Sequence, residues 1–265
     1  MSEQLINVLI YSATVISGLM FTVWLISLML RDASIVDLIW GVGFVLVGWT
    51  SVLKTQSDNW ILPLLTTIWG LRLSGYLAWR NHGQPEDYRY RAMRNHHGKS
   101  FPLLSIVTVF GLQGLIMWIV SLPLQAGAIA TNSAWKWLLI PGVVLWTIGL
   151  CFETLGDWQL ARFKADPNNA GAVLDSGLWR YTRHPNYFGD FAVWWGLYFV
   201  AMSHSGAWWT VIGPIVMSVF LMRVSGVTLL EQSLTKTKPR YADYTARTNV
   251  FFPGPPRSTN ADAVQ

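Results

Sequence analysis

A group of cationic residues stands directly before a long aromatic and apolar run in the second half of the chain. Arg180, Arg183 and His184 are followed at once by Pro185. Proline suits the first turn of a helix, where its missing N–H costs nothing, so the sequence predicts a helix start near residues 184–185. Free N–H groups at a helix start, with cations nearby, bind phosphate or carboxylate. The segment is a candidate anion site; the alternative is that it marks the positive side of a membrane protein, with lipid headgroups as its anions.

Two carboxylates precede this segment at a spacing that places them on one helix face. Glu153 and Asp157 are four residues apart. Two like charges this close are unfavourable unless a ligand, an arginine or a proton separates them. Arg162 and Lys164 follow within two turns and are plausible partners. The pair is therefore a second candidate for a polar ligand contact.

Two more ionisable residues, Asp37 and Arg72, interrupt apolar windows in the first half of the chain. An ionisable group inside a membrane span is costly, so it usually faces a cavity or a partner and indicates function. The alternative is that Asp37 and Arg72 form an ion pair that only orients two helices.

The elements that must position these groups are membrane helices. Of the 265 residues, 52% are hydrophobic and only 12% are charged, whereas a soluble domain carries about 25% charge. We therefore expect an all-α polytopic bundle of about seven transmembrane helices with cytoplasmic cofactor-binding loops. The windows long enough to cross a bilayer are about 5–30, 34–53, 60–79, 102–122, 135–155, 187–203 and 207–228.

The distribution of basic residues predicts the orientation of these spans. Arginine and lysine concentrate in residues 80–100, in residues 156–186 and after residue 228, while the opposite connections hold few. Cytoplasmic loops retain such an excess, so the N-terminus is expected outside and the C-terminus in the cytoplasm. Topology also accounts for the net charge of +5, and no nucleic-acid partner is implied.

The chain is expected to form a single domain over residues 1–256, with a disordered tail at 257–265. No metal site is predicted, because the single cysteine, Cys151, lies in an expected span and the five histidines do not cluster with acids. Oligomeric state is left open.

Two runs in the C-terminal half resemble the steroid 5-alpha-reductase-like membrane enzymes. They are GLWRYTRHPNYFGD at residues 177–190 and KPRYADYTAR at residues 238–247. Within that group the chain looks closest to the bacterial branch known as DUF1295, whose patterns VDLIWG at 36–41 and WGLR at 69–72 also match. The resemblance covers roughly residues 30–253 and implies an integral protein of the bacterial inner membrane, with the cofactor-binding half at about 150–253.

The resemblance to the reductases implies NADPH as the cofactor. The related isoprenylcysteine carboxyl methyltransferases imply S-adenosylmethionine as the alternative. The reductase pattern implies polar contacts from Asn81, Asp157, Tyr181, Asn186 and Asp190, and cations from Arg162, Lys164, Arg180 and Arg183. A methyltransferase would use Arg183, His184, Asn186 and Tyr187. The number of cations at 162–183 favours the dinucleotide.

The reaction implied is reduction of an activated C=C bond in a lipophilic substrate that enters from the bilayer. Asp37 is expected to act with Tyr88 in stabilising the enolate oxygen, with Tyr76 and Tyr90 as other possible partners. Steroid reductases use a Gln-Glu pair that this chain lacks, so a steroid substrate does not follow. The alternatives are a membrane methyltransferase and a non-enzymatic lipid-binding or assembly protein.

Overall fold

The computed structural model describes residues 2–129, 131, 133–224, 226–227, 230–231, 234–235, 238 and 241–257, and over these residues the chain is helical with no strand. The chain forms two compact units. Unit 1 comprises Met1–Leu139 and Leu197–Gly213, and unit 2 comprises Ile140–Gly196 and Pro214–Gln265. Division into two units does not test the expectation of a single domain, which stays a prediction.

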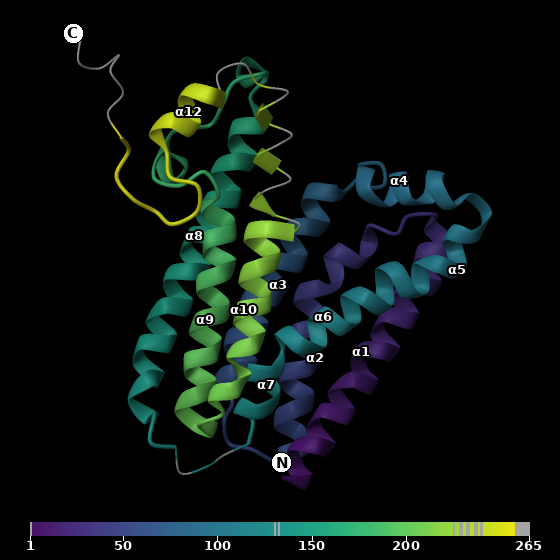
Figure 1. The fold of residues 1–265 in the computed structure, drawn as a ribbon, viewed down its shortest axis with the longest axis vertical. Coiled ribbons are helices and arrows are strands. Elements are labelled where there is room, and N and C mark those ends of the chain that lie inside the picture. The colour runs from purple at the N-terminus through teal and green to yellow at the C-terminus, as the bar shows by residue number, and fades with distance from the viewer. Residues whose placement is uncertain are drawn as a thin grey trace. The chain divides into compact units, whose positions relative to one another are not determined.

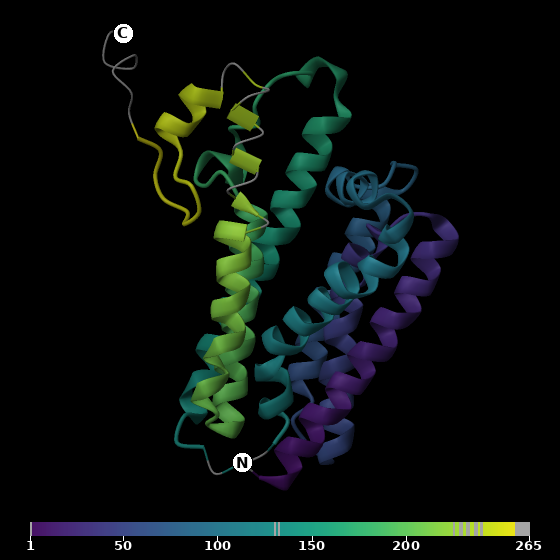
Figure 2. The same ribbon diagram turned by 45° about the vertical axis from the view of Figure 1, so that its right-hand side comes forward.

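Unit 1 is built around three long helices that run side by side, α1 (Glu3–Leu30), α2 (Ile35–Thr55) and α3 (Ile61–Asn81) (Figures 1 and 2). The helices α2 and α3 approach closely at two glycines. A Cβ on Gly70 would lie 2.5 Å from the carbonyl oxygen of Gly41. Small residues allow this approach, which is how helices associate in a bilayer, where burial of apolar surface gives little driving force.

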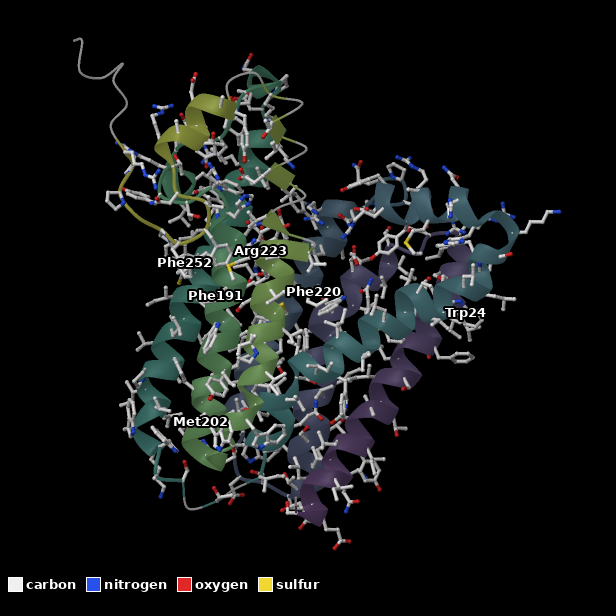
Figure 3. All side chains as sticks on the ribbon, viewed as in Figure 1. Trp24, Phe191, Met202, Phe220, Arg223 and Phe252 are labelled. Carbon is white, nitrogen blue, oxygen red and sulfur yellow. The ribbon has the colours of Figure 1, made fainter. Side chains whose placement is uncertain are left out.

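The rest of unit 1 contains one long interrupted helical run and shorter elements. The run comprises α4 (Tyr88–His97), η1 (Gly98–Ser100), α5 (Phe101–Ser105), η2 (Ile106–Gly111) and α6 (Leu112–Val120). It is followed by α7 (Leu122–Gly127) and η3 (Lys136–Leu138), and η6 (Trp208–Val211) completes the unit. The indole Nε1 of Trp24, labelled in Figure 3, donates to the carbonyl oxygen of Pro102 at 2.9 Å and ties α1 to α5. The η2 segment is a π-helix, a distortion that is frequent at functional sites.

Unit 2 is built from α8 (Leu139–Ala165), the first part of α9 (Pro185–Ser205) and most of α10 (Ile212–Val219), which run side by side in both views (Figures 1 and 2). The helices α8 and α9 meet at glycines. A Cβ on Gly149 would lie 2.6 Å from the carbonyl oxygen of Gly189, and a Cβ on Gly196 would lie 2.6 Å from the backbone nitrogen of Trp146. The two helix backbones are therefore in direct contact.

Shorter elements surround these helices in unit 2. They are η4 (Pro167–Asn169), η5 (Gly177–Arg180), η7 (Phe220–Val224) and α12 (Tyr241–Arg247). The segment after α12 packs on α9 through aromatic rings. Phe191 contacts both Phe251 and Phe252 with ring centroids 5.6 Å apart, and Figure 3 shows Phe191 and Phe252 close together.

Among the described residues, five helical runs are long and apolar enough to cross a membrane. They are Glu3–Leu30, Ile35–Thr55, Ile61–Asn81, Tyr88–Val120 and Lys136–Ala165, and they contain most of the first five windows expected from the sequence. The sixth window corresponds to α9, and the seventh corresponds to the shorter apolar run Trp208–Val224. Seven spans, the cytoplasmic loops and the orientation of the termini stay predictions. Of the expected tail, residues 258–265 lie outside the described part of the chain.

Candidate functional site

The carboxylate of Asp37, in the first turn of α2, is the centre of a polar network in unit 1. One oxygen, Oδ1, accepts a hydrogen bond from the hydroxyl of Tyr90 at 2.7 Å, and the other, Oδ2, accepts one from the guanidinium of Arg89 at 2.8 Å. Arg89 thus pairs with one oxygen of the Asp37 carboxylate, and the Tyr90 phenol is hydrogen-bonded to the other. An ionised carboxylate in an apolar helix needs this kind of compensation.

The network continues beyond Tyr90 to α6 and back to α2. The side-chain amide of Gln113 donates to the Tyr90 hydroxyl oxygen at 2.8 Å, and the indole Nε1 of Trp40 donates to the Gln113 side-chain oxygen. The Tyr90 hydroxyl therefore both donates and accepts, which are the two roles that a phenol offers. Its oxygen is polarised by one neighbour and its proton is held by another.

The start of α4 fixes which side chains face Asp37. Asp87 caps this helix by accepting from the backbone N–H of Arg89 at 2.9 Å, so Tyr88 is the first helical residue. Residues two apart in a helix point in different directions, and accordingly Tyr90 is 6% exposed and Tyr88 is 62% exposed. The tyrosine that contacts Asp37 is thus Tyr90, whereas the sequence interpretation put Tyr88 first.

A second carboxylate, Glu86, ties the α4 region to the connection between α1 and α2. It accepts from the backbone N–H of Ala33 at 2.8 Å and from the guanidinium of Arg94 at 2.8 Å. Burial alone would raise the pKa of Glu86, but the hydrogen bonds from Arg94 and Ala33 outweigh it and hold the pKa below its ordinary value. The ionised Glu86 side chain therefore holds the α4 region, which carries Arg89 and Tyr90, against the connection between α1 and α2.

The ion pair between Asp37 and Arg72, which the sequence left open as an alternative, is not the one in which Asp37 takes part. Asp37 pairs with Arg89, which comes from α4 rather than α3. The guanidinium of Arg72 lies over the ring of Tyr76, 5.5 Å from its centroid. This arrangement follows from the position of α4, which sequence spacing alone did not indicate.

An apolar pocket of about 560 Å³ lies in unit 1 between α1 and the η2–α6 segment. Its walls include Ile16 and Met20 from α1 and Phe110 and Trp118 from the facing segment. Gly114 lines the same pocket and follows Gln113 of the Asp37 network directly in the chain. Because both walls are candidate membrane spans, the pocket suits a lipophilic molecule.

In unit 2 the two sequence-predicted carboxylates of α8 are buried. Glu153 is 3% exposed and Asp157 is 5% exposed. The side-chain amide of Asn186, in the first turn of α9, donates to Asp157 at 3.1 Å. The close contact of α8 with α9 thus brings together two of the residues expected at the cofactor site.

The largest polar cluster of unit 2 centres on Glu231, which the sequence interpretation missed. Its Oε1 lies 2.8 Å from His184 Nε2, accepts from the hydroxyl of Tyr241 at 2.7 Å and forms an ion pair with Arg183 Nε at 3.1 Å. Arg183 also donates to the backbone oxygen of Thr245 at 3.1 Å. Arg183 and His184 are 8% and 2% exposed, and both side chains contact this glutamate.

This cluster sets the charge state of its members. Burial raises the pKa of Glu231, but the hydrogen bonds from His184 and Tyr241 and the charge of Arg183 outweigh burial, so the pKa lies below its ordinary value. Burial and the hydrogen bond to Glu231 raise the pKa of Tyr241. Glu231 is therefore held as a carboxylate.

The remaining residues expected at the cofactor site differ in exposure. Arg162, Lys164, Arg180 and Tyr181 are exposed, while Asn81, Asn186, Tyr187 and Asp190 are half-buried. The ring of Tyr187 stacks on His184 with centroids 5.7 Å apart. Asn81 is in unit 1 and accepts from Arg80 Nε at 3.0 Å, whereas the others are in unit 2.

Comparison with known proteins identifies the family. The family model described as "Protein of unknown function (DUF1295)" matches residues 23–248. An uncharacterized protein of Schizosaccharomyces pombe is 27% identical over 223 residues, which are 73% of this chain and 62% of the yeast protein. The chain thus spans less than two thirds of that relative, and no solved structure matches. The match of the family model over most of the sequence shows that this chain belongs to the DUF1295 family, which is part of the steroid 5-alpha-reductase-like group.

Proposed function

We propose that this protein is an integral-membrane, NADPH-dependent reductase of an activated C=C bond, such as an enone, in a lipophilic substrate. The observation that carries the proposal is the hydrogen bond from the Tyr90 hydroxyl to Asp37, at the edge of candidate membrane spans. Reduction of an enone places negative charge on the carbonyl oxygen, and a positioned O–H donor stabilises that charge. Membership of the steroid 5-alpha-reductase-like group agrees with this chemistry.

In this proposal Tyr90 takes the role that the sequence interpretation gave to Tyr88. Its O–H rotates about the C–O bond, so the proton that it donates to Asp37 can instead face a substrate oxygen. Gln113 donates to the phenol oxygen and strengthens the phenol as a donor, because chained hydrogen bonds polarise one another. Arg89 balances the charge of Asp37, which keeps that carboxylate in place as the acceptor that orients Tyr90.

The apolar pocket of unit 1 is the proposed site for the hydrocarbon part of the substrate. Its walls are two candidate spans, so a lipid-soluble molecule can reach it from the bilayer without crossing water. Burying an apolar skeleton there contributes about 25 cal/mol per Å² removed from water.

The residues of unit 2 suit a phosphorylated dinucleotide. Arg162, Lys164 and Arg180 are exposed and can pair with pyrophosphate and the 2′-phosphate. Asp157 and Asn186 offer a carboxylate and an amide for hydroxyl and carboxamide groups. When bound, NADPH supplies a hydride to the carbon β to the substrate carbonyl. Arg183 and His184 contribute indirectly, since their contacts with Glu231 hold the segment before α9 in shape.

Ligand-dependent thermal stability of the purified protein in detergent tests the cofactor. A ligand that binds the native state raises its stability, by about 2.7 kcal/mol at a concentration of 100 times Kd. We expect NADPH to raise the melting temperature more than NADH does. We expect S-adenosylmethionine to leave the melting temperature unchanged. A shift with S-adenosylmethionine alone would replace the proposal by methyl transfer, and no shift with any of them would favour a lipid-binding protein.

Oxidation of NADPH in the presence of a panel of enone lipids then tests the chemistry. Tyr90→Phe removes the proposed donor and is expected to lower the rate about 100-fold. Tyr88→Phe is the matched control, because Tyr88 is exposed on the same helix, and its rate is expected to stay within about twofold of wild type. Equal rates for the two variants would remove Tyr90 from the mechanism.

A further inference from the structure

A polar pocket of about 590 Å³ lies within unit 2, separate from the contacts of Asp157 and Glu231. Three segments of the chain form it: residues 175–180, residues 244–248 and residues 256–257. Each segment contributes one arginine to the lining, Arg180, Arg247 and Arg257. Only Arg180 was indicated by the sequence as a ligand contact.

Hydrogen bonds between the segments hold the pocket in shape. The hydroxyl of Tyr244 donates to the backbone oxygen of Trp179 at 2.6 Å, and the backbone N–H of Arg257 donates to the backbone oxygen of Arg247 at 2.9 Å. The side-chain oxygen of Gln159 accepts from the backbone N–H of Leu178 at 3.0 Å. The bonds join the three walls to one another and to α8, so the arginines project from fixed backbone.

A glycine allows one wall to approach α8. Gly177 has φ +59°, a left-handed conformation that favours glycine, and a Cβ there would lie 2.5 Å from the side-chain nitrogen of Gln159. The first residue of η5 therefore cannot carry a side chain without moving the wall that presents Arg180.

The charge of the lining residues is positive. The lining contains three arginines and one carboxylate, Asp175, whose Oδ2 lies 3.6 Å from Nη2 of Arg247. These two side chains are 54% and 41% exposed, so their attraction is weak and Asp175 leaves most of the positive potential in place. Phosphate monoesters carry a charge of about −1.5 to −2 at neutral pH, which balances the excess of two positive charges.

We propose that this pocket binds a phosphate monoester group. Guanidinium groups match phosphate oxygens with paired N–H donors, which a single lysine cannot do. The group is carried by a nucleotide or by a lipid headgroup, since both have the same recognition chemistry. Because Arg180 is also assigned to the phosphates of NADPH in the proposed function, the nucleotide source rests on that proposal, whereas the lipid source does not.

Binding of small phosphates to the full-length protein tests the proposal. Adenosine 2′,5′-bisphosphate is expected to raise the melting temperature, whereas adenosine, which lacks phosphate, is expected to leave it unchanged. Phosphatidic acid in nanodiscs, compared with phosphatidylcholine in nanodiscs, tests the lipid source. A shift with the nucleotide alone or with phosphatidic acid alone assigns the source, and no shift with either overturns the proposal.

Two substitutions then test whether the arginines are responsible. Arg257→Gln and Arg247→Gln together are expected to weaken binding of the effective ligand at least about tenfold, through loss of two charged contacts. The backbone bond between these residues is kept in the double variant. Arg223→Gln, an exposed cation of η7 outside the pocket lining and without a role in the proposed cofactor site, is the matched control and is expected to keep wild-type affinity. Wild-type affinity in the double variant, or an equal loss in the control, would contradict the proposal.

Discussion

Each of the two units holds a half-buried carboxylate with similar partners, but the contacts are arranged differently. In unit 1, Asp37 divides its contacts, giving one oxygen to Tyr90 and the other to Arg89. In unit 2, a single oxygen of Glu231 faces His184, Tyr241 and Arg183. Each centre combines a carboxylate, a tyrosine and an arginine.

The difference lies in what the tyrosine does next. The Tyr90 hydroxyl also accepts from Gln113, so it belongs to a chain of hydrogen bonds that leads on to α6. Tyr241 donates to a glutamate that Arg183 and His184 also contact. The Tyr90 hydroxyl of unit 1 can therefore turn to donate to a ligand. In unit 2 the same residue types hold the backbone segments around Glu231 together.

The largest effect is expected from removing the charge of Glu231. Glu231→Gln leaves the guanidinium of Arg183 buried without its carboxylate, and breaking a buried ion pair costs about 3 kcal/mol or more. We expect a clear fall in the melting temperature of the detergent-purified protein. Asp243→Asn removes an exposed carboxylate from α12 and is the control, expected to change stability by less than about 0.5 kcal/mol. A result in which the two variants are equally stable would mean that Glu231 does not fix unit 2.

A smaller effect on stability is expected at Asp37. Asp37→Asn keeps an oxygen that can accept from Tyr90, and Arg89 retains its contact with Asp87 at 2.9 Å. We expect a loss of about 1.5–3 kcal/mol, the range for hydrogen bonds to charged groups. The same measurement on Asp58→Asn, an exposed carboxylate of unit 1, gives the baseline. A loss larger than that of Glu231→Gln would reverse the comparison between the units.

The smallest effect is expected from pH. The pKa of Glu231 lies below its ordinary value of 4.5, so its stabilising contribution is complete at neutral pH and is lost as the pH falls below about 4.5 through the folded-state pKa. The difference in melting temperature between wild type and Glu231→Gln is expected to shrink from pH 7 to pH 4. Glu86 and Asp87 also have lowered pKa values, but they are present in both proteins and cancel. A difference that stays constant over this range would show that the charge of Glu231 is not what stabilises unit 2.

The fold was largely predictable from the sequence because membrane helices have a strong local signal. Runs of apolar residues marked the five long helices to within a few residues, apart from the extension through α4 and the extension of α8 to Ala165, and Pro185 marked the start of α9. The last two windows were harder to assess, because α9 mixes aromatic and polar residues and the final apolar run ends in the π-helix η7.

The contacts within the sites were less predictable because they depend on tertiary packing. Asp37 could be singled out as a charge in an apolar window, but its partner Arg89 lies 52 residues away on a short polar helix. The choice between Tyr88 and Tyr90 depended on the N-cap at Asp87. Once Asp87 is known to cap α4, the positions of Tyr88 and Tyr90 on the helix follow, and with them the tyrosine that faces Asp37.

Glu231 could not be singled out for the same reason. It lies 47 residues from His184, and its neighbours in the sequence gave no pattern that connected the two. The sequence therefore indicated that Arg183 and His184 matter, but it assigned their charge to a cofactor rather than to a carboxylate of the chain itself.

The contacts between the segment before α9 and the segment after α12 have a consequence for how the protein is made. Thr182 donates to the backbone oxygen of Phe251, Arg183 donates through its backbone N–H to Asn249, and Tyr181 accepts from the backbone N–H of Gly254. During synthesis these partners are produced several seconds apart, at roughly 5–20 residues per second. The arginine-rich segment therefore leaves the ribosome before the residues that shape it. This segment therefore reaches its final conformation late in biosynthesis, after most of the expected spans have entered the membrane.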